Sequence, residues 1–293
     1  MKNKTRGALL CLCMAQTLCG CYADDGNQAD TSGQEFSEAS NGKMIVEALD
    51  VGKADSILIR TQNHNVLIDT ATSKEGSEIR DYLTELGIEK LDYLIITHFD
   101  KDHVGGASKI LKSIGADNIL QPDYEGNTDA YEKYMQRVTE LSLNQITLCE
   151  DLSFILDDVY FTVYPPEKKE YIEEDNDFSL VVTAIHGGNR FLFTGDAEKE
   201  RVNEIISYNL GDFDYIKVPH HGVYEDNLPV LFNTVKAEYA VICDSDKEQA
   251  DKLTINALEK AGASVYETRD GSVTAVSDGK SISLTTEKNI SVR

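Results

Sequence analysis

The sequence predicts an α+β domain built from layers of strands and helices. Alternating, β-branched segments at 44–51, 56–60 and 65–69 predict three consecutive strands. Residues 77–87 repeat apolar side chains at helical spacing and end in a glycine, and the apolar run 91–96 predicts the next strand. A run of hairpin strands followed by a helix and another strand is the order of an α+β layered domain.

Further helices and strands follow along the chain as far as residue 193. His64 lies on the predicted turn between the second and third strands, and His186 lies on a later hairpin turn, so we expect both to be exposed. Apolar periodicity and β-branched content predict helices at 108–114 and 130–141 and strands at 118–121, 154–156, 159–164, 178–185 and 190–193.

Four metal-competent side chains follow the strand at 91–96 within six residues. They are His98, Asp100, Asp102 and His103. Imidazoles and carboxylates this close together repel or desolvate one another unless a cation lies between them, so the group predicts a metal site at a strand end. The alternative is a solvated acidic turn with two incidental histidines. The glycine pair at 105–106 should let the backbone turn tightly before the next helix.

Two later strands also end in metal-competent residues. One leads into Asp196, and the next leads into His220 and His221. Strand ends on one edge of a layered sheet converge in space, so we expect these residues to join the first group. Lys217 lies on the last of these strands, and we expect its side chain to point toward solvent.

The chain is strongly acidic, with 51 acidic and 28 basic residues and a formal net charge of -23. It lacks the basic footprint with which proteins neutralise a nucleic-acid backbone, so stable wrapping of nucleic acid is not expected. An enzyme that grips one phosphodiester through metal ions is compatible with this charge, because the ions supply local positive charge. The 293 residues, 41% of them hydrophobic, suffice for one large domain or two small ones.

The first 42 residues have the composition of a targeting and linker segment. Basic residues precede an apolar run at 8–18 that is too short to span a bilayer. Together with the sequence LCGC at 18–21, residues 1–20 resemble a bacterial lipoprotein signal, and Cys21 would carry the lipid. Residues 21–42 then form a lipidated cysteine and a flexible acidic tether, and 43–293 form the folded domain. We therefore expect an extracytoplasmic protein that is lipid-anchored to the cell membrane.

Two cysteines, Cys149 and Cys243, lie in the predicted domain, and the other four belong to the signal and its cleavage site. A disulfide between the two is compatible with an extracytoplasmic protein, but no spacing pattern supports it. Two buried free thiols are the simpler interpretation.

Three motifs, THFDKDHVGG at 97–106, FTGDA at 193–197 and VPHHG at 218–222, resemble the signature of the metallo-β-lactamase-fold superfamily. Flanking segments, such as LDVGKADSILI at 49–59 and AGASVYETRDGSVTAVSDG at 261–279, resemble the hydrolase domain of the competence DNA-uptake protein ComEC and its stand-alone relatives. The similarity spans residues 44–284. It implies a four-layer αββα sandwich.

The resemblance also implies two metal subsites with Asp196 between them. The first would contain His98, Asp100 and the region of Asn176, and the second would contain Asp102, His103 and His220. Asn176 and Ser179 are expected to contact substrate or to support the ligands. The family usually has histidines where Asp100 stands and near Asn176. A carboxylate-rich subsite favours harder ions, so the expected cofactor is one or two divalent metal ions, zinc or manganese.

A metal site of this kind hydrolyses esters, because the ions activate water and offset the negative charge of the transition state. Asp102 would orient the water as well as bind metal, and His221 would either assist the leaving group or support the site. The sequence departs from the branch after VPHHG, where Ser or Thr is usual, and it lacks the late His-Pro pair, with no histidine at 246–253.

Two functions remain open from the sequence. The favoured one is a surface-tethered metal-dependent hydrolase of a phosphodiester or another ester, either a nuclease or a cell-envelope phosphodiesterase. The alternative, favoured by the missing histidines, is a non-catalytic lipoprotein that retains the fold as a binding or assembly component. A β-lactamase is disfavoured because the first motif lacks a His-x-His pair. No protein partner is indicated.

Overall fold

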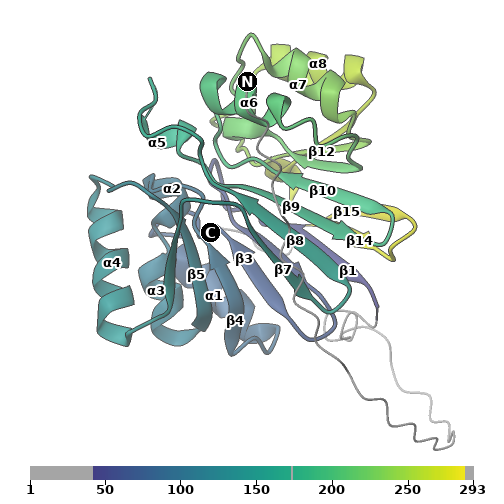
Figure 1. The fold of residues 1–293 in the computed structure, drawn as a ribbon. Coiled ribbons are helices and arrows are strands. Elements are labelled where there is room, and N and C mark those ends of the chain that lie inside the picture. Colours follow the sequence, from purple (N-terminus) through teal and green to yellow (C-terminus); the bar gives the residue numbers. More distant parts are fainter. Residues whose placement is uncertain (1–41, 173, 288–293) are drawn as a thin grey trace, which may run out of the picture. The chain divides into compact units, whose positions relative to one another are not determined.

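Two β-sheets pack against each other through a shared apolar core, and helices cover the outer face of each sheet (Figure 1). The computed structural model describes residues 42–172 and 174–287. The resulting order of helix, sheet, sheet and helix confirms the predicted four-layer αββα sandwich.

The first sheet has eight strands in the order β15-β14-β1-β2-β3-β4-β5-β6. Strands from β15 to β3 pair antiparallel, and those from β3 to β6 pair parallel. Its strands are β1 (Met44–Ala48), β2 (Ile57–Arg60), β3 (Asn65–Ile68), β4 (Lys90–Ile95), β5 (Gly115–Pro122), β6 (Gln145–Leu148), β14 (Ser272–Ser277) and β15 (Ile282–Glu287).

The second sheet has seven strands in the order β13-β12-β11-β10-β9-β8-β7. Strands from β13 to β10 pair parallel, and those from β10 to β7 pair antiparallel. Its strands are β7 (Leu152–Leu156), β8 (Val159–Tyr164), β9 (Val181–His186), β10 (Asn189–Phe193), β11 (Tyr215–Lys217), β12 (Tyr239–Ile242) and β13 (Ser264–Glu267).

Helices on the two outer faces bury separate apolar clusters. Side chains of α1, α3 and α4 pack on the first sheet, and side chains of α6, α7 and α8 pack on the second. The helices are α1 (Gly76–Glu85), α2 (Lys101–Val104), α3 (Ala107–Ser113), α4 (Asp129–Leu141), α5 (Glu174–Asp177), α6 (Lys199–Ser207), α7 (Leu228–Val235) and α8 (Lys252–Ala261), with short 3-10 turns at η1 (Pro219–Gly222) and η2 (Thr268–Asp270).

Strand β2 shows why both faces of these sheets are apolar. Successive side chains of a strand point to opposite faces, so Ile57 and Ile59 enter the core between the sheets while Leu58 packs beneath the helices. The hairpin strands expected at 44–51, 56–60 and 65–69 are confirmed as β1, β2 and β3, with antiparallel pairing.

Two expectations about exposure are wrong. His186 is buried at the end of β9, and its Nδ1 lies 2.8 Å from Ser277 Oγ on β14, because the first sheet covers this end of the second. Cys149 and Cys243 are both free thiols as expected, but only Cys243 is buried, and Cys149 is exposed. His64 is partly exposed as expected, with its Nδ1 2.7 Å from Asp92 Oδ1.

The predicted signal at 1–20, Cys21 and most of the tether lie outside the described residues, and so do the last residues of the predicted domain. Among the residues that are described, none of the helices has the length and apolar character needed to cross a membrane. The domain boundary at residue 43 and the lipid anchor therefore stay predictions.

Candidate metal centre

Predicted site residues from both sheets come together at the carboxyl ends of parallel strands. His98 follows β4 and His103 lies on the short helix α2, at the edge of the first sheet. Asp196 follows β10, and His221 follows the neighbouring strand β11 of the second sheet. Parallel strands end at the same edge of a sheet, which is why loops from distant parts of the sequence meet here.

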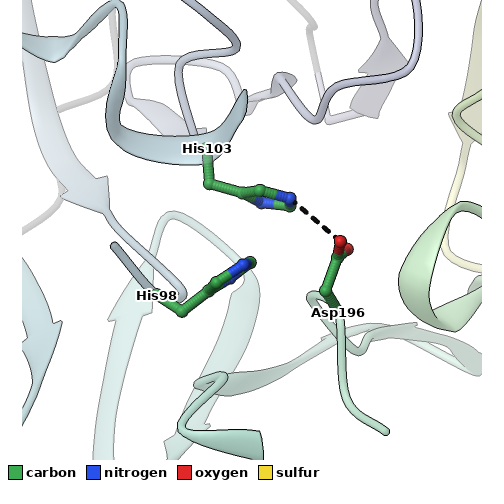
Figure 2. A group of neighbouring side chains, drawn as sticks. All are labelled: His98, His103 and Asp196. Atoms are coloured by element: carbon green, nitrogen blue, oxygen red, sulfur yellow. Dashed lines mark ion pairs between the residues drawn. The ribbon is translucent and has the colours of Figure 1, made fainter. Parts of the chain in front are cut away.

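One group of side chains at this edge consists of His98, His103 and Asp196 (Figure 2). Figure 2 shows both imidazole rings and the carboxylate directed toward one another, and the ion pair drawn there joins His103 Nε2 to Asp196 Oδ2 at 3.2 Å. One ligand atom from each of the three residues lies within 4.8 Å of the others. The spacing is that of a site in which one ion contacts all three side chains.

A second group shares His103 with the first and adds Asp102 and His221. His221 Nε2 lies 3.6 Å from Asp102 Oδ2 and 3.0 Å from Asp196 Oδ2. The same oxygen of Asp196 therefore faces both His103 and His221. As in the predicted pair of subsites, Asp196 lies between the two groups, but His103 belongs to both and His221 stands in place of His220.

Each of the three rings is held through its Nδ1 atom. His103 Nδ1 lies 2.8 Å from Asp69 Oδ2, and His221 Nδ1 lies 2.8 Å from the carbonyl oxygen of Cys243. His98 Nδ1 lies 3.1 Å from the hydroxyl of Thr97. Partners of this kind fix ring orientation and leave Nε2 as the metal-binding atom.

The three Nε2 atoms are buried. That of His98 has no hydrogen-bond partner, and those of His103 and His221 both face one carboxylate oxygen, Asp196 Oδ2, at 3.2 and 3.0 Å. An orphaned polar atom is costly in a protein interior, so His98 Nε2, beside two other imidazoles that converge on one carboxylate oxygen, indicates a missing partner that accepts lone pairs. Burial, and next the charge of His103, hold the pKa of His98 well below its usual range, which leaves this ring neutral and able to bind a cation. The donor set of imidazoles and carboxylates fits a divalent metal ion.

Asp69 is a supporting residue that the sequence analysis did not single out. It is fully buried after β3, where its carboxylate accepts hydrogen bonds from the Thr97 backbone (2.8 Å) and hydroxyl (2.6 Å) as well as facing His103. The signal was present, because Asp69 is another carboxylate at the end of an apolar strand.

The glycine pair at 105–106 is required for a reason other than the backbone freedom that was expected. Gly105 and Gly106 do form the turn between α2 and α3, but with helical φ values of -60° and -80° that any residue adopts. What excludes a side chain is space, since a Cβ on Gly105 would lie 2.1 Å from the Lys101 carbonyl and one on Gly106 would lie 2.2 Å from the Thr70 carbonyl. This close approach brings α2, and with it His103, against Asp69.

Lys217 does not point to solvent, and that expectation is wrong. Strand β11 lies in the interior of the second sheet with both faces covered, so its side chains are all buried, and Lys217 is 0% exposed. Its ammonium contacts Asp55, which is also buried, and lies 3.1 Å from Asp196 Oδ1. Asp55, which the sequence did not mark as a ligand, groups with Asp196 and His221 at metal-ligand spacing.

His220 lies beside the centre and not within it. Its Nδ1 is 3.0 Å from Glu198 Oε1, and Glu198 accepts a hydrogen bond from Asn176 at 2.7 Å. The two adjacent histidines have left-handed φ values of 45° and 50°, and this backbone directs His221, not His220, into the cluster. We therefore take His221 in place of His220 as the ligand candidate of the second group.

Asp100 lies at the border of the first group. Its Oδ2 is 3.9 Å from His98 Nε2, outside the groups at metal-ligand spacing, and its side chain is 36% exposed. Burial, followed by the charges of Asp175 and Asp102, raises the pKa of Asp100 to about 6. The side chain is therefore less strongly held as a carboxylate than those of Asp102 and Asp196, whose pKa values are lowered.

Ser179 supports the ligand residues through hydrogen-bonding contacts. Its hydroxyl accepts a hydrogen bond from the Asp196 backbone at 3.0 Å and lies 3.5 Å from His98 Nδ1. Its carbonyl accepts a hydrogen bond from the buried guanidinium of Arg201 at 2.9 Å. Asn176 acts more indirectly, through Glu198.

The chain belongs to the metallo-beta-lactamase superfamily, because residues 49–243 match that family model over more than half of the sequence. The solved structure of Igni18, a metallo hydrolase from Ignicoccus hospitalis, is similar in fold, with a TM-score of 0.52 and 18% identity over 79% of this chain and 98% of that one. Family and fold together support a metal-dependent hydrolase fold that binds divalent metal.

Within the superfamily, the chain is similar to ComEC-related competence proteins. It is 30% identical to Recombination protein 2 of Haemophilus influenzae over 212 residues, which is 71% of this chain and 25% of the relative. It is 31% identical to ComE operon protein 3 of Bacillus subtilis over 199 residues, which is 60% of this chain and 25% of the relative. The chain therefore spans about a quarter of the length of these relatives.

Divalent metal should stabilise the protein through this cluster. After chelation and dialysis, Mn²⁺ or Zn²⁺ at about 100 times its dissociation constant should add roughly 2.7 kcal/mol to the free energy of unfolding and raise Tm by roughly 5–10 °C. His103→Ala should abolish the rise, because His103 belongs to both groups. His64→Ala, which removes a histidine paired with Asp92 elsewhere, should keep it. An equal rise in His103→Ala would contradict the assignment.

Proposed function

We propose that this protein is a metal-dependent hydrolase of phosphodiester bonds. The observation that carries the proposal is the convergence of three buried imidazole Nε2 atoms on the carboxylates of Asp102 and Asp196 at metal-ligand spacing. A purely structural cluster would give His98 Nε2 a hydrogen-bond partner, as it does the three Nδ1 atoms, yet this nitrogen has none.

The proposed ligands are His98, His103 and His221, with Asp196 between the two groups and Asp102 beside them. When bound, divalent ions supply an acidified water and positive charge that offsets the charge of the transition state. Imidazoles suit zinc and carboxylates suit manganese, and the mixed set supports either one or two ions of these metals.

Asp102 is proposed to orient the attacking water. Its side chain is 25% exposed, unlike that of the buried Asp196, so it borders the space where substrate approaches. Burial by itself would raise the pKa of Asp102, but its hydrogen bond with His221 and the charge of His103 outweigh burial and lower the pKa. Asp102 therefore stays ionised at neutral pH and can accept a hydrogen bond from water.

His220 is proposed to give a proton to the leaving group. The sequence made His221 a candidate for this role or for support of the site, and both of its ring nitrogens are engaged, one at the Cys243 carbonyl and one in the cluster. His220 is partly exposed, its ring centre is 6.2 Å from that of His221, and Glu198 orients it through Nδ1. A histidine oriented by a carboxylate beside a metal cluster is suited to general acid catalysis.

A phosphodiester is the proposed substrate class for two reasons. The relatives are named for recombination and competence. Metal clusters of this composition can offset the negative charge that develops on a phosphoryl group during hydrolysis. The formal net charge of -23 disfavours stable wrapping of nucleic acid, so a short oligonucleotide or a cell-envelope phosphodiester suits the chain better than long DNA.

The first test is the hydrolysis of bis(p-nitrophenyl) phosphate with Mn²⁺ or Zn²⁺. The wild type should turn over only with metal, and Asp102→Ala should lower kcat/KM by about 10²–10⁴. Asp117→Ala, which removes an exposed carboxylate on β5, is the control and should match the wild type. Bound metal without turnover, on this ester and on a wider panel, would favour the alternative of a non-catalytic binding protein.

The role of His220 is tested by comparing two leaving groups. A p-nitrophenolate departs without a proton, whereas the alkoxide released from the dinucleotide dTpT needs one. His220→Ala should therefore lower hydrolysis of dTpT by about 10² or more and that of bis(p-nitrophenyl) phosphate by less than about 10-fold. Equal losses on both substrates would show that His220 supports the site without donating the proton.

We also propose that the chain is tethered outside the cytoplasm through a lipid on Cys21. The basic start, the short apolar run and the sequence LCGC support this proposal. In a bacterial host, Cys21→Ser should move the protein from the membrane fraction to the soluble fraction and abolish incorporation of labelled fatty acid. Cys19→Ser, two residues away, is the matched control and should stay membrane-bound. Unchanged fractionation of Cys21→Ser would refute the anchor.

A further inference from the structure

Lys217 brings a permanent positive charge into the candidate metal centre. Its side chain is completely buried, and the ammonium has three acceptors, which are the carboxylate of Asp55, Asp196 Oδ1 at 3.1 Å and the Gly195 carbonyl at 2.9 Å. An ammonium group has three N–H donors, so Lys217 is saturated by these contacts. It does not reach out to substrate.

The position of this ammonium coincides with one of the groups at metal-ligand spacing. Asp55, Asp196 and His221 offer ligand atoms within 4.8 Å of one another, and two of these three residues are the carboxylates that Lys217 contacts. A divalent ion bound by both of these carboxylates would lie close to the ammonium that already contacts them, and two positive charges at that distance repel strongly in a buried site. In this group the chain's own lysine already neutralises the carboxylates.

The two oxygens of Asp196 consequently have different partners. Oδ1 faces the ammonium of Lys217, and Oδ2 faces His103 at 3.2 Å and His221 at 3.0 Å. With Oδ1 engaged, Asp196 offers a single oxygen, Oδ2, on the side of His103 and His221. The orientation of this carboxylate, and hence its way of binding metal, depends on Lys217.

We propose that Lys217 is an internal cation that replaces a metal ion in the group of Asp55, Asp196 and His221. It thereby sets how many divalent ions the centre holds. It also positions Asp196 Oδ2 for the ions that His103 and His221 would bind. This inference rests on metal binding by the cluster, which is part of the proposed function, but it does not require hydrolysis.

The test is the number of Mn²⁺ ions bound per chain in the wild type and in Lys217→Met, measured by equilibrium dialysis and elemental analysis. Methionine has a similar length but no charge, so the carboxylates of Asp55 and Asp196 lose their partner. We expect Lys217→Met to bind about one ion more than the wild type. The double variant Asp55→Asn with Lys217→Met should lose that extra ion, because one of its carboxylates is gone.

Lys236→Met is the matched control. Lys236 is an exposed lysine that pairs with Asp212 at 3.4 Å, and its loss should leave the metal count unchanged. A folded Lys217→Met variant that binds no additional ion would overturn the proposal.

Folding of the variant provides a second readout. Buried carboxylates that lose their ammonium partner destabilise a protein, so Lys217→Met should need Mn²⁺ to reach the circular dichroism spectrum of the wild type or should fold more stably with it. A variant that stays unfolded with and without Mn²⁺ would also count against the proposal. Because the readout is metal content and not turnover, it remains decisive when hydrolysis is absent, whereas a wild type that binds no ion would overturn the proposal together with its premise.

Discussion

The candidate metal centre depends on one constraint, which is that each of its imidazole rings is held through Nδ1. The partners are different in kind: a carboxylate for His103, a backbone carbonyl for His221 and a hydroxyl for His98. A neutral imidazole has one donor and one acceptor nitrogen, so engaging Nδ1 directs Nε2 toward the cluster. Supporting residues such as Asp69 therefore matter to metal binding as much as the ligands do.

The ligands and the residues that hold them come from both sheets, so the site exists only when the two sheets are packed together. Asp69 and His98 follow strands of the first sheet, whereas Asp196 and Cys243 follow strands of the second. The core between the sheets includes Cys243 itself and Ile68, the residue that precedes Asp69. The apolar packing that stabilises the fold is thus the same packing that brings the metal ligands to their distances.

Buried charge is the second physical demand of this site. Asp55, Asp69 and Asp196 are nearly or completely buried, and isolated buried carboxylates are unstable as ions. Lys217 and the imidazoles provide the compensating partners. Burial by itself would raise the pKa of Asp196, but the charges of His103, His221 and Lys217 outweigh it and hold that pKa well below its usual range. The carboxylate is therefore ionised and ready to bind a cation.

The sequence by itself determined the first strands, the main helices and the convergence of three strand ends, because periodicity and neighbouring residue types are local properties of the chain. It did not reveal Lys217, because the exposure of a lysine depends on what covers its strand, and both faces of β11 are covered. The sequence also could not show which of His220 and His221 is the ligand candidate. Only the tertiary structure decided which of them enters the cluster, because their left-handed backbone redirects the side chains.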